Sequence, residues 1–197
     1  LRREALEQDA ALTKQVSWTK RFPLTVMRRE GWIDANAKGA SLVESLLRFF
    51  GVASPEAYDN RWETVPVAFR KSSAYATDPQ SLAVWLRRGE QLAVSIETRP
   101  FDAERARSVV AACRAWTTLS FEDGFRSACE AFADAGVAVV VVPHIPKTCV
   151  SGAARWLSKD RALIQLSLRF KKADHAWFTL LHEAGHILLH GKRELFV

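Results

Sequence analysis

The sequence of 197 residues contains no apolar run of the roughly 20 residues that a membrane span needs. Its longest apolar run, from Gly136 to Pro143, has the length of a buried strand. The charged N-terminal residues carry no apolar core of the kind found in signal peptides. We therefore expect no membrane contact and a cytoplasmic location. An initiator methionine is also missing, and we expect the chain to be part of a longer protein.

Cysteine is scarce: Cys113, Cys129 and Cys149 are an odd number at scattered positions. This spacing argues against a disulfide framework and against a Cys-x-x-Cys metal site. It predicts reduced thiols that pack as small core residues. A glycine-rich phosphate loop, an internal repeat and a low-complexity tract are absent as well.

The overall composition is that of a globular protein, with 48% hydrophobic and 25% charged residues. This length suits one domain of ordinary size or two small ones. The net charge of +6 allows an acidic or nucleic-acid partner, but such a modest excess is more typical of a solvated surface.

Helical signals fill the first two-thirds of the chain, where apolar residues recur three and four apart. Ser41, Asp102 and Asp174 are the expected N-caps of three helices, and Gly51 and Gly191 are the expected C′ residues of two. The helices are expected at 1–20, 24–30, 41–50, from 55, 78–97, 102–117, 120–135 and 174–190, with an irregular stretch at 61–77.

The pattern changes after Gly136. The β-branched run Val137 to Val142 predicts a central strand. Two more strands are expected at 153–158 and 162–167, with a tight turn at Lys159-Asp160. The fold class is therefore α+β, with a small sheet packed on the last helix. We divide the chain into a helical interdomain region (1–77), a further helical region (78–135) and a truncated C-terminal domain (136–197).

A His-Glu-x-x-His motif is formed by His182, Glu183 and His186. Histidines four apart on a helix lie about 6 Å apart along its axis, so both imidazoles can bind one Zn²⁺ ion. Glu183 follows the first ligand, beside the metal and not bound to it. There it can take a proton from a water that the metal activates and deliver it to a leaving amine. A pair of hydrogen-bonded core histidines is the structural alternative.

The third metal ligand is missing from the obvious place. Leu189 stands where the longer metallopeptidase motif has glycine, and Arg193 stands where it has its third histidine. Glu194 could fold back toward the metal, but we expect the ligand beyond Val197. Two histidines and a carboxylate suit manganese and iron as well as zinc.

Three further features have weaker functional interpretations. His190 lies roughly 12 Å along the helix axis from His182, which favours a helix-end role near the negative pole. His144 and Lys147, in the loop after the first strand, could contact substrate or stabilise an oxyanion, although ordinary loop polarity explains them too. The strand at 153–158, or its partner, could pair at its edge with an extended peptide.

Several segments together carry a family resemblance: the strand ending at Pro143, and residues 150–156, 162–167 and 177–191. Over Val139 to Gly191 the chain resembles the ImmA/IrrE family of bacterial metallopeptidases. Residues 29–33, 47–52 and 83–90 are similar to longer members of that family, in which an Xre-type helix-turn-helix domain precedes the peptidase domain.

The resemblance implies a cytosolic, zinc-dependent endopeptidase that cleaves a transcriptional repressor or antitoxin. It implies His182 and His186 as ligands, Glu183 as the catalytic carboxylate and an acidic third ligand on a later helix. The same interpretation is compatible with DNA as a partner, bound through a helix-turn-helix domain outside this chain, and with a homodimer. The alternative is a DNA-binding regulator or antitoxin whose peptidase-like domain is a non-catalytic sensor or assembly module.

Overall fold

The computed structural model describes residues 10–62, 77–167, 169 and 172–190. These residues form two compact units. The N-terminal unit contains residues 10–62, 77–87 and 145–148. The sheet unit contains residues 88–144 and the described residues from 149 to 190. Within this described part, no helix has the length and apolarity that crossing a membrane requires.

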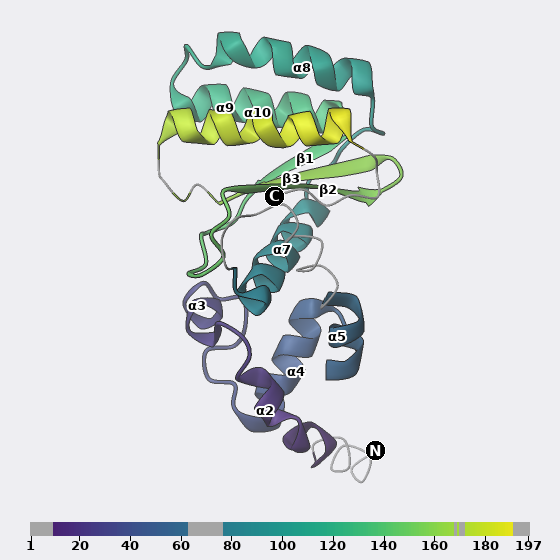
Figure 1. Cartoon of the computed structure of the whole chain (residues 1–197), viewed down its shortest axis with the longest axis vertical. Coiled ribbons are helices and arrows are strands. Elements are labelled where there is room, and N and C mark those ends of the chain that lie inside the picture. Colours follow the sequence, from purple (N-terminus) through teal and green to yellow (C-terminus); the bar gives the residue numbers. More distant parts are fainter. Residues whose placement is uncertain (1–9, 63–76, 168, 170–171, 191–197) are drawn as a thin grey trace. The chain divides into compact units, whose positions relative to one another are not determined.

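The N-terminal unit is helical, as expected (Figure 1). Its helices are α2 (Val16–Thr19), α3 (Leu24–Arg29), α4 (Gly39–Phe50), α5 (Pro55–Trp62) and the first part of α7 (Pro79–Val94). They enclose an aromatic core in which Phe50 contacts Tyr58, with ring centroids 4.6 Å apart, and Trp18 contacts Phe22 at 4.8 Å. Edge-on aromatic pairs of this kind stabilise a small core beyond the area they bury.

The start of α4 differs from the sequence prediction. The helix begins at Gly39, and Ser41 is its third residue rather than its N-cap. The Ser41 hydroxyl accepts a hydrogen bond from the Lys38 backbone N–H at 3.1 Å. Ser41 thus satisfies the helix end from inside the first turn, as the third residue of a capping box does. At the other end Gly51 has φ of 66°, which confirms its predicted left-handed conformation.

Helix α7 begins as predicted, because the Asp78 carboxylate accepts from the Ser81 N–H at 2.8 Å. It ends at Val94, three residues before the expected end at Glu97. The Arg161 guanidinium donates to the carbonyl of Ala93, in the last turn of the helix, and to the carbonyl of Ile96, just beyond its end. Residues 79–87 of α7 belong to the N-terminal unit and residues 88–94 to the sheet unit.

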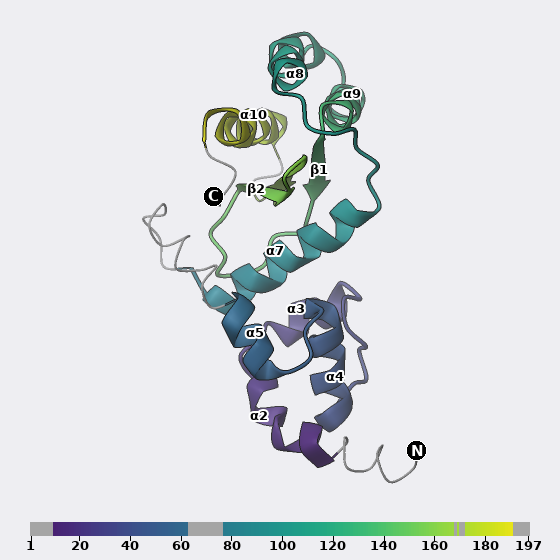
Figure 2. The same ribbon diagram turned by 90° about the vertical axis from the view of Figure 1, so that its right-hand side faces the viewer.

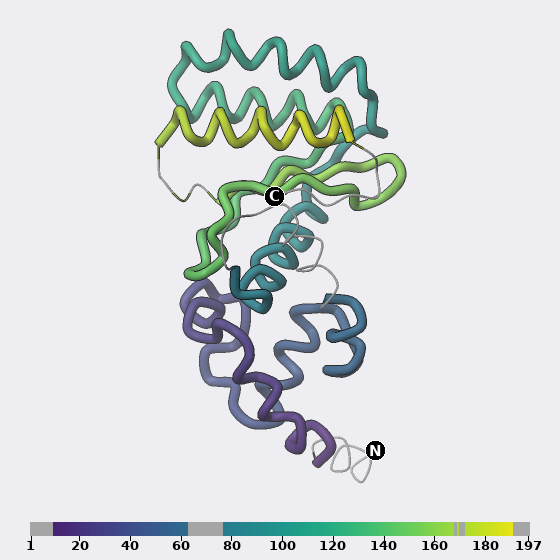
Figure 3. The backbone as a smooth tube through the Cα atoms, in the orientation of Figure 1, coloured from purple at the N-terminus to yellow at the C-terminus, as the bar shows by residue number. Residues whose placement is uncertain are grey.

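The sheet unit is built on three strands: β1 (Val137–Val141), β2 (Gly152–Ser158) and β3 (Arg161–Leu166). β2 and β3 form the expected antiparallel hairpin, which turns at residues 159–160 (Figure 3). β1 pairs with β3 in parallel, with Val139 opposite Ile164. The strand order is β1-β3-β2. The mixed α+β class predicted from the sequence is therefore confirmed.

The prediction of a central strand at Val137 to Val142 is wrong. Among the described strands β3 is central, and β1 is at an edge. Val137 and Val139 are nevertheless buried in the core beneath the helices, and Ala138 and Val140 are buried on the opposite face. An unbroken apolar strand indicates burial of both faces, whether or not the strand has neighbours on both sides.

Helices α9 (Phe121–Asp134) and α10 (Ala173–Leu189) lie on one face of this sheet, and α8 (Ala103–Trp116) packs on these two helices. Figure 2 views them nearly end-on, with α9 over β1, α10 over β2 and α8 farther from the strands. Asp102 caps α8 as predicted, and Ser120, the first residue of the next expected helix, is the N-cap of α9. The shared core includes Val109, Phe132, Ile164, Leu180 and Ile187.

The last turns of α7 pack against the strands through polar contacts. Gly89 approaches Gln165 so closely that a Cβ there would lie 1.8 Å from the Gln165 Oε1 atom. Glu90 forms an ion pair with Arg155 of β2 at 3.1 Å, and both side chains are largely buried. Because Ala162, Ile164 and Leu166 of β3 belong to the helix-covered core, Gln165 projects to the other face.

Candidate metal centre

Helix α10 carries the predicted motif and begins one residue earlier than expected. Lys172, in extended conformation, is its N-cap, and Asp174 lies within the first turn. An acidic residue there is stabilised by the positive end of the helix dipole without acting as the cap. Trp177, Leu180, Ala184 and Ile187 form the core-facing side of the helix.

The two motif histidines lie together on α10. His182 is exposed, His186 is half-buried, and their Nε2 atoms are 3.1 Å apart. Two nitrogens bound to one tetrahedral zinc ion at about 2.05 Å would be about 3.3 Å apart. The observed spacing therefore fits two ligands of the same ion with little change in side-chain conformation.

The electrostatics of this pair also fit metal binding. Burial lowers the pKa of His186, and the neighbouring His182 and His190 lower it further. A lowered pKa keeps the imidazole neutral, which is the form that binds a metal. Within residues 10–62, 77–167, 169 and 172–190, no group of three or more His, Cys, Asp or Glu side chains is arranged to hold a metal. Glu194, the candidate for folding back, lies outside the described residues, as does Gly191.

Glu183 faces the sheet, and its side chain is buried between α10 and β2. Only 2% of its surface is exposed, and its Oε2 atom has no hydrogen-bond partner among the described residues. Burial raises the pKa of this carboxyl to about 8. A cation held by the adjacent imidazoles would favour its ionised form. An acidic side chain with an unsatisfied oxygen beside two convergent histidines is an arrangement typical of functional sites.

Glu183 packs against a strand residue that the sequence does not point to. A Cβ at Gly152, the first residue of β2, would lie 2.8 Å from both Cγ and Oε1 of Glu183. The only signal for this contact in the sequence is a glycine at the start of a strand, a position where glycine often marks the close approach of another group.

His190 is the C-cap of α10, in agreement with a position at the helix end. Its backbone N–H donates to the His186 carbonyl at 3.1 Å, and the two imidazole centroids are 5.3 Å apart. The chain turns into extended conformation here, with ψ of 164°. An imidazole at this end is favourably placed to interact with the negative pole of the helix.

The loop residues predicted to assist catalysis are divided between the two units. His144 belongs to the sheet unit and is half-buried, and its pKa is lowered by burial and by Arg169. Lys147 belongs to the N-terminal unit, where its carbonyl accepts from the Asp78 N–H at 3.0 Å. A role in substrate contact or oxyanion stabilisation stays a prediction for both.

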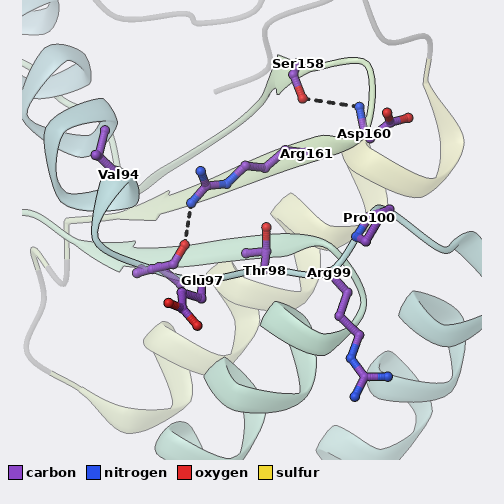
Figure 4. A pocket seen from close by; sticks show the side chains of 9 residues that line it. Val94, Glu97, Thr98, Arg99, Pro100, Ser158, Asp160 and Arg161 are labelled. Carbon is purple, nitrogen blue, oxygen red and sulfur yellow. Dashed lines mark hydrogen bonds between the residues drawn. The ribbon is translucent and has the colours of Figure 1, made fainter.

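A separate pocket of about 570 Å³ lies where residues 96–100 approach the turn between β2 and β3 (Figure 4). Its charged side chains include Arg99, which pairs with Asp134, and Asp160, which pairs with Lys159. Arg161 is also in its wall, with its guanidinium turned toward the end of α7. No lining residue belongs to α10, so this pocket is not part of the histidine site.

The three cysteines have different environments, so the prediction of three core thiols is only partly correct. Cys113 is buried, Cys129 is half-buried, and Cys149 is exposed with φ of 54°. Desolvation raises the pKa of Cys113 and of Cys129 to about 11. These two thiols are therefore almost fully protonated at neutral pH.

This difference predicts selective alkylation. At pH 8, iodoacetamide should modify Cys149 at least about tenfold faster than Cys113 or Cys129, because the thiolate is the reacting form. Peptide mapping by mass spectrometry would follow the three sites separately. A Cys149→Ser variant should lose the fast phase. Fast labelling of Cys113 in the folded protein would contradict the predicted order.

The chain was also compared with protein-family models, with curated proteins and with solved structures, and none of the three comparisons gave a match.

Proposed function

We propose that the sheet unit is a zinc-dependent endopeptidase domain that hydrolyses a peptide bond in a protein substrate. The observation that carries this proposal is the combination on α10 of two imidazole nitrogens 3.1 Å apart with a buried, incompletely hydrogen-bonded Glu183. The resemblance of residues 139–191 to the ImmA/IrrE metallopeptidases leads to the same expectation. It further suggests a repressor or antitoxin as the substrate, in the cytoplasm of a bacterium.

Each motif residue has a defined role in this proposal. His182 and His186 would hold the metal through Nε2. Bound zinc supplies Lewis-acid chemistry, which acidifies water and polarises the scissile carbonyl. The Glu183 carboxylate accepts the proton of the attacking water as the new C–O bond forms. It then gives that proton to the amine nitrogen as the C–N bond breaks.

An extended peptide could reach this site along β2. That strand pairs with β3 on one side, and no described strand pairs with its other edge. An open edge offers backbone N–H and C=O groups to an incoming strand. Because Glu183 packs on Gly152 of β2, a peptide paired with this edge would pass close to the carboxylate. We therefore favour an unfolded or extended segment as the substrate.

Metal content tests the proposal first. Protein purified together with the segment expected to carry the third ligand should contain zinc by elemental analysis, and His182→Ala in that protein should lose it. Zinc affinity should fall by more than the roughly 10–100-fold that loss of an outer-shell partner costs. His175→Ala is the matched control, because it removes another exposed imidazole from the same helix.

Zinc that is absent from the unaltered protein, or that survives in His182→Ala, would contradict the metal centre. The non-catalytic sensor or assembly module would then be the better explanation of this domain. A zinc-loaded protein that cleaves no peptide in a proteome-derived library would leave the metal centre intact and exclude the peptidase.

A further inference from the structure

The contact between Gly152 and helix α10 is tighter than any side chain allows. A Cβ at Gly152 would lie 2.6 Å from Cγ2 of Thr179 and 2.8 Å from Cγ and Oε1 of Glu183. Cβ atoms in folded proteins do not approach other heavy atoms this closely. The φ angle of Gly152 is outside the left-handed region. The site thus requires glycine for the space it leaves, and its backbone conformation suits other residues as well.

The two α10 side chains above Gly152 have little freedom to move away. Thr179 is buried, and its hydroxyl donates to the His175 carbonyl at 2.8 Å. This bond fixes the rotamer that directs the Thr179 methyl group toward β2. Glu183 lies one helical turn farther along the same face and is 2% exposed. Gly152 is itself held in the sheet, opposite Leu166 of β3.

We propose that Gly152 is a positioning residue, which sets the depth at which the Glu183 carboxylate lies between α10 and β2, beside the histidine pair. The inference rests on the proposed peptidase function for its catalytic consequence. A methyl group at position 152 has to displace the Glu183 side chain, the Thr179 methyl or the helix itself. His182 is exposed and His186 is half-buried, and neither is among the atoms nearest to Gly152, so a displaced carboxylate is compatible with an unchanged pair of ligands.

The catalytic test uses Gly152→Ala in the full chain. We expect kcat for the fastest-cut library peptide to fall by about 100-fold, the lower range for loss of general acid–base catalysis. KM should change less than about threefold. Zinc affinity, measured by competition with a chelator, should also change less than about threefold, because neither ligand is altered. In a Glu183→Gln background, Gly152→Ala should lower kcat no further, because the group it positions is already inactive. An unchanged kcat in Gly152→Ala would overturn the proposal. So would a Gly152→Ala loss that is as large in the Glu183→Gln background as in the unaltered protein.

A second measurement separates this inference from the peptidase proposal. Gly152→Ala should lower the thermal unfolding midpoint by about 5 °C, as overpacking does. Most of that loss should vanish in a Glu183→Ala background. Gly185→Ala is the control for an added methyl group: a Cβ there has no heavy atom within 4 Å, and alanine is the better helix former, so the midpoint should not fall. If the loss persists undiminished without the Glu183 side chain, Thr179 alone accounts for the contact, and the positioning role is wrong whether or not the protein cleaves peptides.

Discussion

Glu183→Gln is expected to reduce peptide cleavage by about 10²- to 10⁴-fold, because an amide cannot take a proton from the attacking water. The substitution keeps the shape of the buried side chain. It also keeps both imidazoles, so the zinc content should be unchanged. The measurement is the initial rate of cleavage of a fluorogenic peptide by zinc-loaded protein, at several substrate concentrations.

The control for this result is the stability of the variant. A neutral amide in the buried slot is no harder to desolvate than a carboxyl group, so the unfolding midpoint should not fall. A variant that keeps zinc, fold and more than a tenth of the activity would rule out Glu183 as the base. If cells that carry Glu183→Gln still regulate the target genes of the protein, the non-catalytic sensor or assembly role becomes the better explanation.

Phe132→Ala is expected to have the largest effect on the stability of the sheet unit. Phe132 of α9 is 1% exposed and belongs to the core that joins α8, α9, α10 and the sheet. Removing a buried phenyl ring costs about 3–5 kcal/mol, through lost transfer free energy and the cavity left behind. Urea unfolding followed by circular dichroism would give the difference.

The matched control is Phe178→Ala, which removes the same ring from a site on α10 that is 68% exposed. It should change the free energy of unfolding by no more than about 0.5 kcal/mol. A loss below about 1 kcal/mol for Phe132→Ala would mean that the core under α9 collapses around the missing ring or is less well packed than described.

Local signals in the sequence predicted most of the elements. Asp78, Asp102 and Ser120 were expected at helix starts, and each accepts a hydrogen bond from a backbone N–H there. The turn at Lys159-Asp160 was predicted because it separates two short apolar strands. The closeness of His182 and His186 is also predictable from local sequence, because the geometry of a single helix determines it.

The features that sequence analysis missed depend on contacts between distant segments. The apolar residues of β1 predict a central strand, yet the pairing of Val137 with Ala162 places β3 in the middle. The early end of α7 at Val94 lies beside a distant partner: Arg161, 65 to 68 residues farther along the chain, donates to the carbonyls of Ala93 and Ile96. The slot that holds Glu183 is made by Gly152, a strand residue that no local pattern connects with α10.

The position of Glu183 against β2 links chemistry to the integrity of the fold. The geometry of one helix brings the two imidazoles together, whereas the position of the carboxylate depends on a contact between a helix and a strand. The carboxylate is held in place only when strand and helix are docked. Under the proposed function, a copy in which β2 has separated from α10 would lack a positioned base and would not act as a protease. A cell that makes such an enzyme would then be protected from indiscriminate cleavage by its misfolded molecules.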